Sequence, residues 1–461
     1  IAVLNTGNLI FIVLCNIIFI TCLISFLKWY KLKFIKLPIS LILVIILSIA
    51  VELLQFNNVP RYDANIYYGS LIKGTEMFNL DLVSFIGAFT CWKWAQGLCL
   101  IIAPFEFLLP RRVIGVYIAN ILITIVTLCV LYWLLRRIYP SISKLSASLY
   151  CLIFAFSPYI IGLFSYLDMD WHIAFFSIWL VAAIYIENDY LISFIGCLLS
   201  FTKITGFAFY VFFLSIFSLV HIIKGKGTSL FISIKNWCKP KRVLLWIAPA
   251  FMFLLSLTYG NYIVSQSFFG TYVSDSMINL FDINQIANTF LQTFVFGFRW
   301  IFAIMMLIGI IVYIIRRKNY HNAEMSYVFS IYLTFVLIFI LLAIYNADAS
   351  CPRYTTVFSA LYIILLPFLM DMIIQKERIQ PVIISILGLI CFIQTFWTID
   401  PSITLYADSI DTGVKKIYKL TYTNDTRPGM NLVSGSDLQY PIIGDVYAYN
   451  LEYSYYDNLL E

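Results

Sequence analysis

Four separated stretches of the sequence carry side chains that could bind and transfer a phosphate-linked group. Their ionisable residues are Asp63, the pair Asp168 and Asp170, Lys203, and Arg353. A carboxylate can take the proton of an attacking hydroxyl, and Lys and Arg bind phosphate oxygens through charge-assisted hydrogen bonds. Together they predict a site for a phosphate-bearing ligand in which one carboxylate acts as a base. At a membrane surface, the natural phosphate donor is a lipid phosphate.

The acidic residues also have structural explanations. Asp63 could be a solvated loop carboxylate, and the Asp168–Asp170 pair could cap a helix that starts at residue 171. Lys203 is harder to explain in this way, because a cation at a break between two apolar helices needs an anionic partner or water. The composition and the positions of the basic residues, described below, predict a membrane protein with all these charges on one side of the membrane. This shared location favours a functional site.

Four further residues flank these stretches and are candidates for a supporting role in the site: Arg61, Tyr67, His172 and Tyr354. His172 taken alone is expected to be a packing residue, and Arg353 could be an interfacial residue that extends its charge toward water.

The composition restricts the class of protein. The chain has 461 residues, of which 62% are hydrophobic and 12% charged, and its mean hydropathy is +0.90. A soluble domain carries about 25% charged residues, so this chain cannot cover a water-facing surface of its own size. Soluble enzymes, nucleic-acid binders and secreted disulfide scaffolds are excluded. Most cysteines sit in apolar runs without metal-type spacing, so no disulfide framework is predicted.

Apolar runs near the length of a membrane span, about 20 residues, predict an all-α polytopic membrane protein with about 12 transmembrane helices. The runs are 8–27, 38–54, 113–135, 145–163, 171–186, 205–223, 243–264, 291–315, 326–345, 355–374 and 381–397. A shorter run, 190–202, precedes the span 205–223. One helix over both would be too long for the bilayer, so a helical pair broken near Lys203 is expected.

The basic residues predict the orientation. With residues 28–36 on the cytoplasmic side and strict alternation, the inside loops hold 18 of the 30 Lys and Arg residues, as the positive-inside rule requires. Most acidic residues then fall on the outer side, together with Asp63, Lys203 and Arg353. The net charge of +6 therefore reports topology and says nothing about acidic partners.

Two domains are expected. Residues 1–397 form the transmembrane domain, with a long outer loop at 55–112 in which the apolar run 94–109 lies at the interface and does not cross. Residues 398–461 have more charge and alternating patterns such as KKIYKLTYTN, which predict a small outer α/β or β appendage. Because the chain begins with Ile1 and not Met, the true N-terminus could be missing, and the C-terminal appendage could be cut short.

At the stretches RYDANIYY, LDMDWH and LLSFTKITGF, and at the late Arg-Tyr pair, the chain resembles the GT-C superfamily of integral membrane glycosyltransferases. This superfamily includes protein O-mannosyltransferases, aminoarabinose transferases and the catalytic subunit of oligosaccharyltransferase. The resemblance covers roughly residues 38–400 and implies a GT-C-like fold and a polyprenyl-phosphate-sugar donor.

The resemblance implies a role for each candidate. Asp63 would be the general base. Asp168 and Asp170 would orient the acceptor or sugar, or hold a divalent metal such as Mg²⁺ or Mn²⁺. Lys203 and Arg353 would contact the lipid phosphate.

The sequence departs from the family at two places. Many relatives have a second carboxylate beside the first-loop Asp, where this chain has Ala64, and either Glu76 or Asp81 could substitute for it. Where many relatives have a His-Pro-Pro-Leu-type stretch, this chain has CWKWAQG. Metal dependence stays open, because some branches of the superfamily work without metal.

The expected function is an inverting membrane glycosyltransferase of hexosyltransferase type. It would move a sugar from a polyprenyl-phosphate donor to an extracytoplasmic glycan, lipid or protein of the cell envelope, with its active site on the outer face of the cell membrane. Two alternatives remain. One is a transporter or lipid flippase, although no internal repeat is evident and the charges lie away from the midplane. The other is a polymerase or ligase of lipid-linked glycans, which would not need the acidic first loop.

Overall fold

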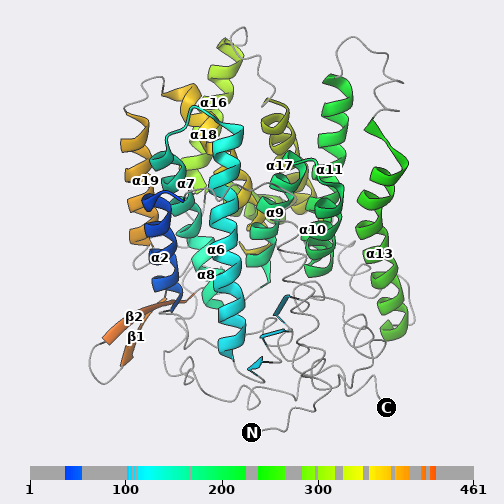
Figure 1. Cartoon of the computed structure of the whole chain (residues 1–461), viewed down its shortest axis with the longest axis horizontal. Coiled ribbons are helices and arrows are strands. Elements are labelled where there is room, and N and C mark those ends of the chain that lie inside the picture. Colours follow the sequence, from blue (N-terminus) through cyan, green and yellow to red (C-terminus); the bar gives the residue numbers. More distant parts are fainter. Residues whose placement is uncertain are drawn as a thin grey trace.

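The structure is a computed structural model that describes most of the predicted helical region (Figure 1). The described residues are 37–53, 101–102, 104–105, 108–109, 113–166, 169–224, 237–265, 283–295, 299–316, 325–345, 352–374, 379–394, 406–411 and 416–421.

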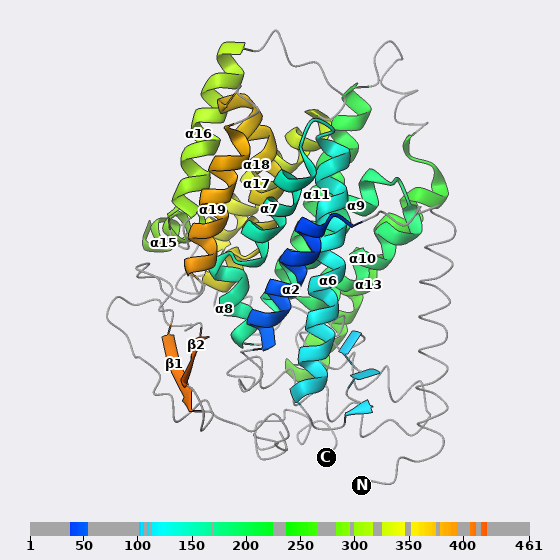
Figure 2. The ribbon, with the colours of Figure 1, turned by 60° about the vertical axis from the view of Figure 1, so that its left-hand side comes forward.

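Apart from one pair of strands, the described elements are helices, and most of them run roughly parallel or antiparallel in one bundle (Figure 2). In chain order the elements are α2 (Ile39–Leu53), α6 (Val113–Ile138), α7 (Lys144–Ala155), α8 (Pro158–Tyr166), α9 (Asp170–Tyr185), α10 (Asp189–Thr202), α11 (Ile204–Lys224), α13 (Pro240–Ser265), α15 (Ile283–Phe294), α16 (Arg299–Arg316), α17 (Met325–Tyr345), the 3₁₀ turn η2 (Pro352–Thr355), α18 (Val357–Ile373), α19 (Gln380–Gln394), β1 (Tyr406–Asp411) and β2 (Lys416–Thr421).

Three of the described helices are long and apolar enough to cross a membrane. These segments are Ile114–Ile138 in α6, Ile204–Ile223 in α11 and Met325–Ile344 in α17. Shorter apolar helices lie beside them in the bundle. The fold is that of a helical membrane protein, in agreement with the composition. The count of twelve crossings stays a prediction, since the first span and several helix ends lie outside the described residues.

Two of the predicted spans are each divided into two helices. The run 145–163 contains the end of α7 at Ala155 and the start of α8 at Pro158, because a proline has no N–H for the preceding turn and suits the first helical position. The run 291–315 contains the end of α15 at Phe294 and the start of α16 at Arg299. The prediction of one continuous helix over each run was therefore wrong.

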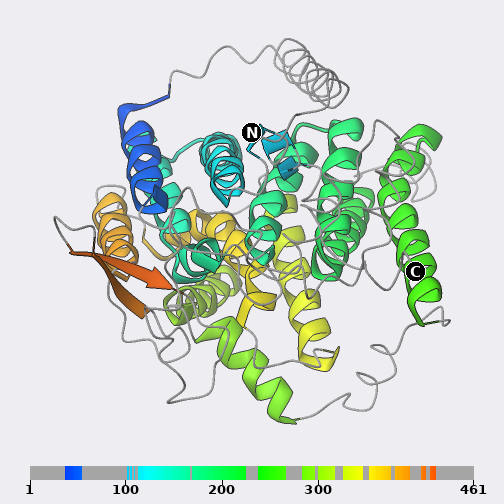
Figure 3. The same ribbon diagram turned by 90° about the horizontal axis from the view of Figure 1, so that it is seen from below.

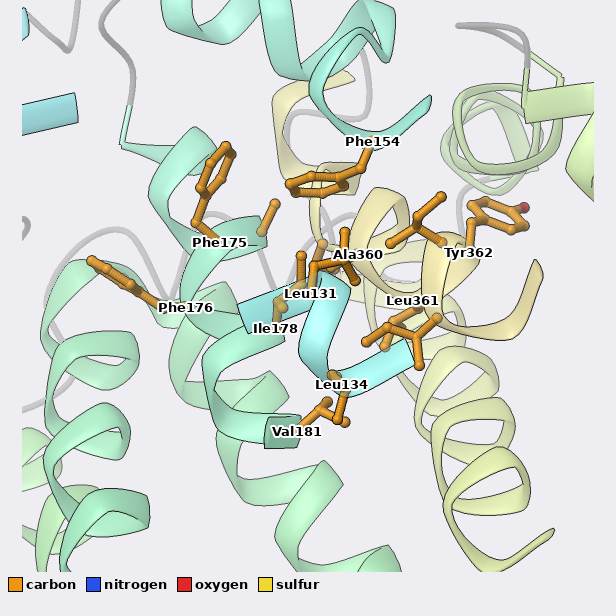
Figure 4. Packing of buried hydrophobic residues seen from close by; sticks show 14 of the residues in the cluster. Leu131, Leu134, Phe154, Phe175, Phe176, Ile178, Val181, Ala360, Leu361 and Tyr362 are labelled. Atoms are coloured by element: carbon orange, nitrogen blue, oxygen red, sulfur yellow. The ribbon is translucent and has the colours of Figure 1, made fainter. Parts of the chain in front are cut away.

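Helices α9 and α18 form the core of the bundle. Nearly all of their described side chains are buried, among them Trp171 and Phe175 of α9 and Phe358 of α18. Figure 4 shows side chains from α6, α7, α9 and α18 meeting in this core. A helix that is apolar all round is a core helix, so these two helices are shielded from lipid by the others.

The peripheral helices expose large apolar side chains. Leu244 of α13 is 71% exposed, Ile315 of α16 is 75% exposed and Val382 of α19 is 57% exposed. In the view along the bundle of Figure 3, these three helices lie at its rim. Exposed apolar surface of this extent on separate helices marks the surface that contacts lipid.

A buried polar stripe runs along α6, and we define it as Asn120, Thr124 and Thr127, all at most 2% exposed. Each member bonds to a neighbouring helix. His172 Nε2 of α9 lies 2.8 Å from Asn120 Oδ1, Trp179 Nε1 donates to Thr127 Oγ1 at 2.8 Å, and Thr124 Oγ1 donates to a carboxylate oxygen of Glu52 in α2 at 2.6 Å. The stripe therefore connects α2, α6 and α9 by directional bonds.

One end of the bundle is basic. The last turn of α6 carries Arg136 and Arg137, and Arg242 in the first turn of α13 bonds to Asp189 at the start of α10, 3.0 Å away. Tyr185 at the end of α9 donates to the Arg137 carbonyl. These contacts place the ends of α6 and α9 and the starts of α10 and α13 at one end, the upper one in Figure 1. This is the end that the charge pattern assigns to the cytoplasm.

Little of the two non-spanning regions lies in the described residues. Strands β1 and β2 pair antiparallel, with Tyr406 opposite Thr421, and β2 falls in the KKIYKLTYTN stretch. The rest of the predicted appendage lies outside the described residues, so the appendage itself stays a prediction. In the run 94–109, which is predicted to lie at the interface, the Leu109 N–H bonds to the Phe105 carbonyl. A Cβ at Gly115 of α6 would lie only 3.1 Å from that oxygen.

Candidate functional site

The predicted break between two helices near Lys203 is confirmed. Helix α10 ends at Thr202 and α11 begins at Ile204, while Lys203 itself has an extended backbone with φ −164° and ψ 159°. Its N–H bonds to the Leu199 carbonyl at 3.5 Å, and its own carbonyl accepts from the Phe207 N–H at 3.0 Å. Lys203 thus ends one helix and starts the next, and the change of direction turns its side chain into the bundle.

A glycine makes this sharp junction possible. A Cβ placed on Gly206, in the first turn of α11, would overlap the backbone carbonyl oxygen of Leu199 in α10. A backbone atom cannot rotate away as a side chain can, so the two helices can approach this closely only because residue 206 has no side chain.

We therefore expect Gly206→Ala to destabilise the protein by about 1–3 kcal/mol, the usual cost of overpacking a close contact. Thermal unfolding of the purified protein in detergent measures the effect. The matched control is Gly309→Ala, where the added Cβ would meet only the end of the flexible Leu369 side chain. If both variants unfold at the wild-type temperature, the close approach of α10 and α11 is wrong.

Lys203 forms a buried ion pair with Asp170. Lys203 Nζ lies 2.6 Å from Asp170 Oδ2, and the two side chains are 7% and 1% exposed. Asp170 is the first residue of α9, and the N-cap position is Met169, which makes no side-chain capping bond. The helix therefore starts one residue before the predicted position, 171. The Asp170 carboxylate neutralises Lys203, which lies 33 residues later in the sequence.

The third member of the cluster is Tyr354 in the turn η2. Lys203 Nζ lies 4.3 Å from the centre of the Tyr354 ring, a distance at which the negative face of the ring attracts a cation. Arg353, the preceding residue, belongs to the same turn, and its side chain is not described. Three of the four predicted stretches therefore meet at this cluster: Asp170, Lys203 and Tyr354. We call it the outer cluster, after the side of the membrane that the charge pattern predicts for it.

Replacing Tyr354 tests the contact between ring and cation. Tyr354→Phe keeps the ring face, and we expect it to retain most of the wild-type stability. Tyr354→Ala removes the ring, and we expect a loss of about 1–2 kcal/mol, since the cation is desolvated here. Chemical or thermal unfolding provides the comparison. Equal stability of the two variants would show that the ring contributes nothing to Lys203.

The sequence reasoning missed Arg299, the first residue of α16. It is 2% exposed, its guanidinium carbon lies 3.8 Å from the centre of the Tyr159 ring, and it donates to the hydroxyl and the carbonyl of Thr355 at 2.7 and 2.9 Å. Thr355 directly follows Tyr354 of the outer cluster. An ionisable residue inside a predicted span was the available signal, but Arg299 was counted within the run 291–315.

Glu52 was missed for a similar reason, because it lies within the predicted span 38–54. It is 4% exposed and accepts the bond from Thr124 described above. His172 is also buried and lies at 4.7 Å from Trp171, edge to face. With its bond to Asn120, His172 has the environment of a packed residue, as expected for it alone.

The remaining candidates lie outside the described residues. They are Asp63, Arg61, Tyr67 and Asp168, together with the substitutes Glu76 and Asp81. Within the described part of the chain, no group of three or more His, Cys, Asp or Glu residues could hold a metal ion. Since Asp168 is outside that part, the predicted metal pair is not tested.

Comparison with known proteins gives no relative for this chain: no family model, no curated protein and no solved structure matches it. The chemistry of the outer cluster is therefore the basis for proposing a function. In this cluster the Lys203 ammonium group is paired with the Asp170 carboxylate and lies against the Tyr354 ring.

Proposed function

We propose that the protein is a membrane glycosyltransferase that takes a sugar from a polyprenyl-phosphate donor and transfers it to an acceptor on the outer face. The acceptor is an envelope glycan, a lipid or a protein. The proposal uses the outer cluster as the phosphate end of the site and the first outer loop as its source of the base.

The contact between Lys203 and Tyr354 is the observation that carries the proposal. The two predicted phosphate ligands, Lys203 and Arg353, are 150 residues apart in sequence. Tyr354 contacts Lys203 directly, and Arg353 is its neighbour along the chain. A Lys and an Arg together suit a phosphate group better than a neutral ligand, so the proposal assigns the donor phosphate to Lys203 and Arg353. In this proposal, Asp170 balances the charge of Lys203 while no donor is bound.

The proposed reaction is a single displacement. The acceptor hydroxyl attacks the anomeric carbon, and its proton passes to the Asp63 carboxylate. The bond between that carbon and the phosphate oxygen breaks, and its electron pair leaves with the polyprenyl phosphate. Lys203 and Arg353 stabilise the negative charge that develops on this leaving group. Attack from the opposite side inverts the anomeric configuration.

The test is transfer of a radiolabelled sugar. The purified protein, reconstituted in vesicles, is given a series of polyprenyl-phosphate hexoses together with membrane extract. We expect one donor to label a product, and we expect Lys203→Met to abolish the labelling. Asp189→Asn serves as the control, because this carboxylate belongs to the ion pair with Arg242 at the opposite end. Absence of labelling with every donor would contradict the proposed function.

The helix break favours one rival. Discontinuous helices with charged residues also occur in transporters and flippases, where they form the substrate site, and α10 and α11 are interrupted at the charged residue Lys203. The same vesicles separate the two functions. Movement of a polyprenyl phosphate or a solute across the bilayer without sugar transfer would support the rival.

A further inference from the structure

The guanidinium group of Arg299 connects four elements at one end of the bundle. One of its terminal nitrogens, Nη1, donates to the Gln292 carbonyl of α15 at 3.0 Å and to Thr355 Oγ1 of η2 at 2.7 Å. The other, Nη2, donates to the Thr355 carbonyl at 2.9 Å and to Ser359 Oγ of α18 at 3.0 Å. The face of the group lies on the Tyr159 ring of α8.

The acceptors are groups that need an outside donor. The last carbonyls of a helix have no partner within the helix, and Gln292 and Thr355 lie at the ends of α15 and η2. Two tyrosines act on the same end of α15, where Tyr159 donates to the Gln292 carbonyl and Tyr362 to the Thr293 carbonyl. Arg299 thus completes the bonding where α15, η2 and α18 meet.

Only arginine fits these acceptors. Its planar group presents several donors in one fixed plane, and that plane can also stack on a ring. A lysine at this position would keep the charge, but its single ammonium group could not reach both oxygens of Thr355 and Ser359 with the same geometry. Arg299→Lys keeps the positive charge and removes the planar set of donors, so this variant distinguishes the effect of the hydrogen-bond geometry from the effect of the charge.

We infer that Arg299 is a positioning residue that fixes the turn Pro352–Thr355, and with it Tyr354, against Lys203. The contacts form one continuous path, from Asp170 through Lys203 and Tyr354 to Thr355 and Arg299. Both oxygens of Thr355 are held by the guanidinium, so the backbone that carries Arg353 and Tyr354 has little freedom. When the guanidinium bonds to Thr355 are lost, the backbone of the turn gains freedom, while the ion pair between Lys203 and Asp170 remains.

Hydrogen exchange of the backbone amides at residues 353–356 tests this inference without any need for catalytic activity. In Arg299→Lys we expect exchange at these amides to become faster by on the order of tenfold, the effect of losing one or two hydrogen bonds to a charged group. Amides of α10 are expected to exchange as in the wild type. The matched control is Arg242→Lys, which removes a guanidinium stacked on Trp237 at the opposite end.

A less disruptive variant tests the same contact if Arg299→Lys does not fold. Thr355→Val removes only the hydroxyl acceptor and leaves the carbonyl bond, so we expect a smaller increase of exchange at the same amides. If Arg299→Lys and Thr355→Val both exchange at the wild-type rate at residues 353–356, the positioning role is overturned. An increase in Arg242→Lys equal to that in Arg299→Lys would overturn it as well.

The effect on catalysis rests on the proposed glycosyltransferase function and is measured separately. We expect Arg299→Lys to raise the KM for the polyprenyl-phosphate sugar and to weaken binding of a polyprenyl monophosphate by about tenfold, while the KM for the acceptor is unchanged. Faster exchange together with unchanged binding of the polyprenyl monophosphate would support the positioning role and contradict the phosphate assignment of Arg353. Unchanged exchange would overturn the positioning role whatever the activity.

Discussion

Replacing Lys203 by Met is expected to lower the free energy of unfolding by about 3–5 kcal/mol, which is the usual cost of removing one partner of a buried ion pair. The substitution leaves the Asp170 carboxylate, whose side chain is 1% exposed, without the cation that lies 2.6 Å away. Asp170→Asn is expected to cost a similar amount, because it leaves the ammonium group without that counter-ion.

The double variant provides the decisive comparison. Lys203→Met with Asp170→Asn removes both charges, so we expect it to recover most of the stability that either single variant loses. Thermal or chemical unfolding of the four proteins gives the coupling energy directly. If the two losses simply add, the residues do not act as a pair.

The pair between Arg242 and Asp189 is the matched control for this cycle. It has a comparable geometry at 3.0 Å, but its side chains are 13% and 23% exposed. Partly exposed pairs contribute about 1 kcal/mol or less, so Asp189→Asn is expected to have a much smaller effect than Asp170→Asn. Sugar transfer should separate the pairs further, since the Lys203 double variant is expected to be stable but inactive.

Asp63→Asn is expected to reduce sugar transfer by about 10²- to 10⁴-fold, the range over which general-base catalysis contributes. The amide is nearly the same size as the carboxylate but cannot accept the proton of the acceptor hydroxyl. We expect expression, unfolding temperature and binding of a polyprenyl monophosphate to match the wild type. The measurement is the initial rate of transfer from the donor found in the radiolabel screen.

Two comparisons make the Asp63 result specific. Asp189→Asn, at the opposite end of the bundle, is expected to keep a transfer rate near that of the wild type. Glu76→Gln and Asp81→Asn test the two residues that could replace the missing second carboxylate of the first outer loop. Near-normal turnover of Asp63→Asn would exclude Asp63 as the base, and a loss in one of the other two would reassign the role.

Sequence alone predicted the class of fold and the break at Lys203 for clear physical reasons. A shortage of charge excludes a soluble surface, and the runs 190–202 and 205–223 together exceed the thickness of a bilayer. The divided helices were harder to predict, because hydropathy measures how apolar a run is and not whether its backbone is continuous. Pro158 was a visible signal for the break between α7 and α8, and the break before Arg299 was signalled by Gly297 and by the charge itself.

The pairing of the candidate residues could not be predicted. Asp170 and Lys203 were both selected from sequence, but they were given separate roles, because hydropathy and charge do not say which helix ends touch. Arg299 and Glu52 were overlooked since each lies within an apolar run, where its burial and its partners depend on tertiary packing. The contact of Tyr354 with Lys203 likewise depends on the turn η2, which precedes α18 and whose position follows from tertiary packing.

The polar stripe of α6 has a consequence for the specificity of helix packing during assembly. Inside a bilayer, lipid chains are as apolar as leucine, so burial of apolar surface does not drive helices together. Glu52, His172 and Trp179 each bond to a different member of the stripe. Rotation of α2 or α9 about its own axis would leave a carboxyl, an imidazole or an indole N–H in hydrocarbon. The stripe therefore selects a single rotational orientation of α2 and α9 relative to α6.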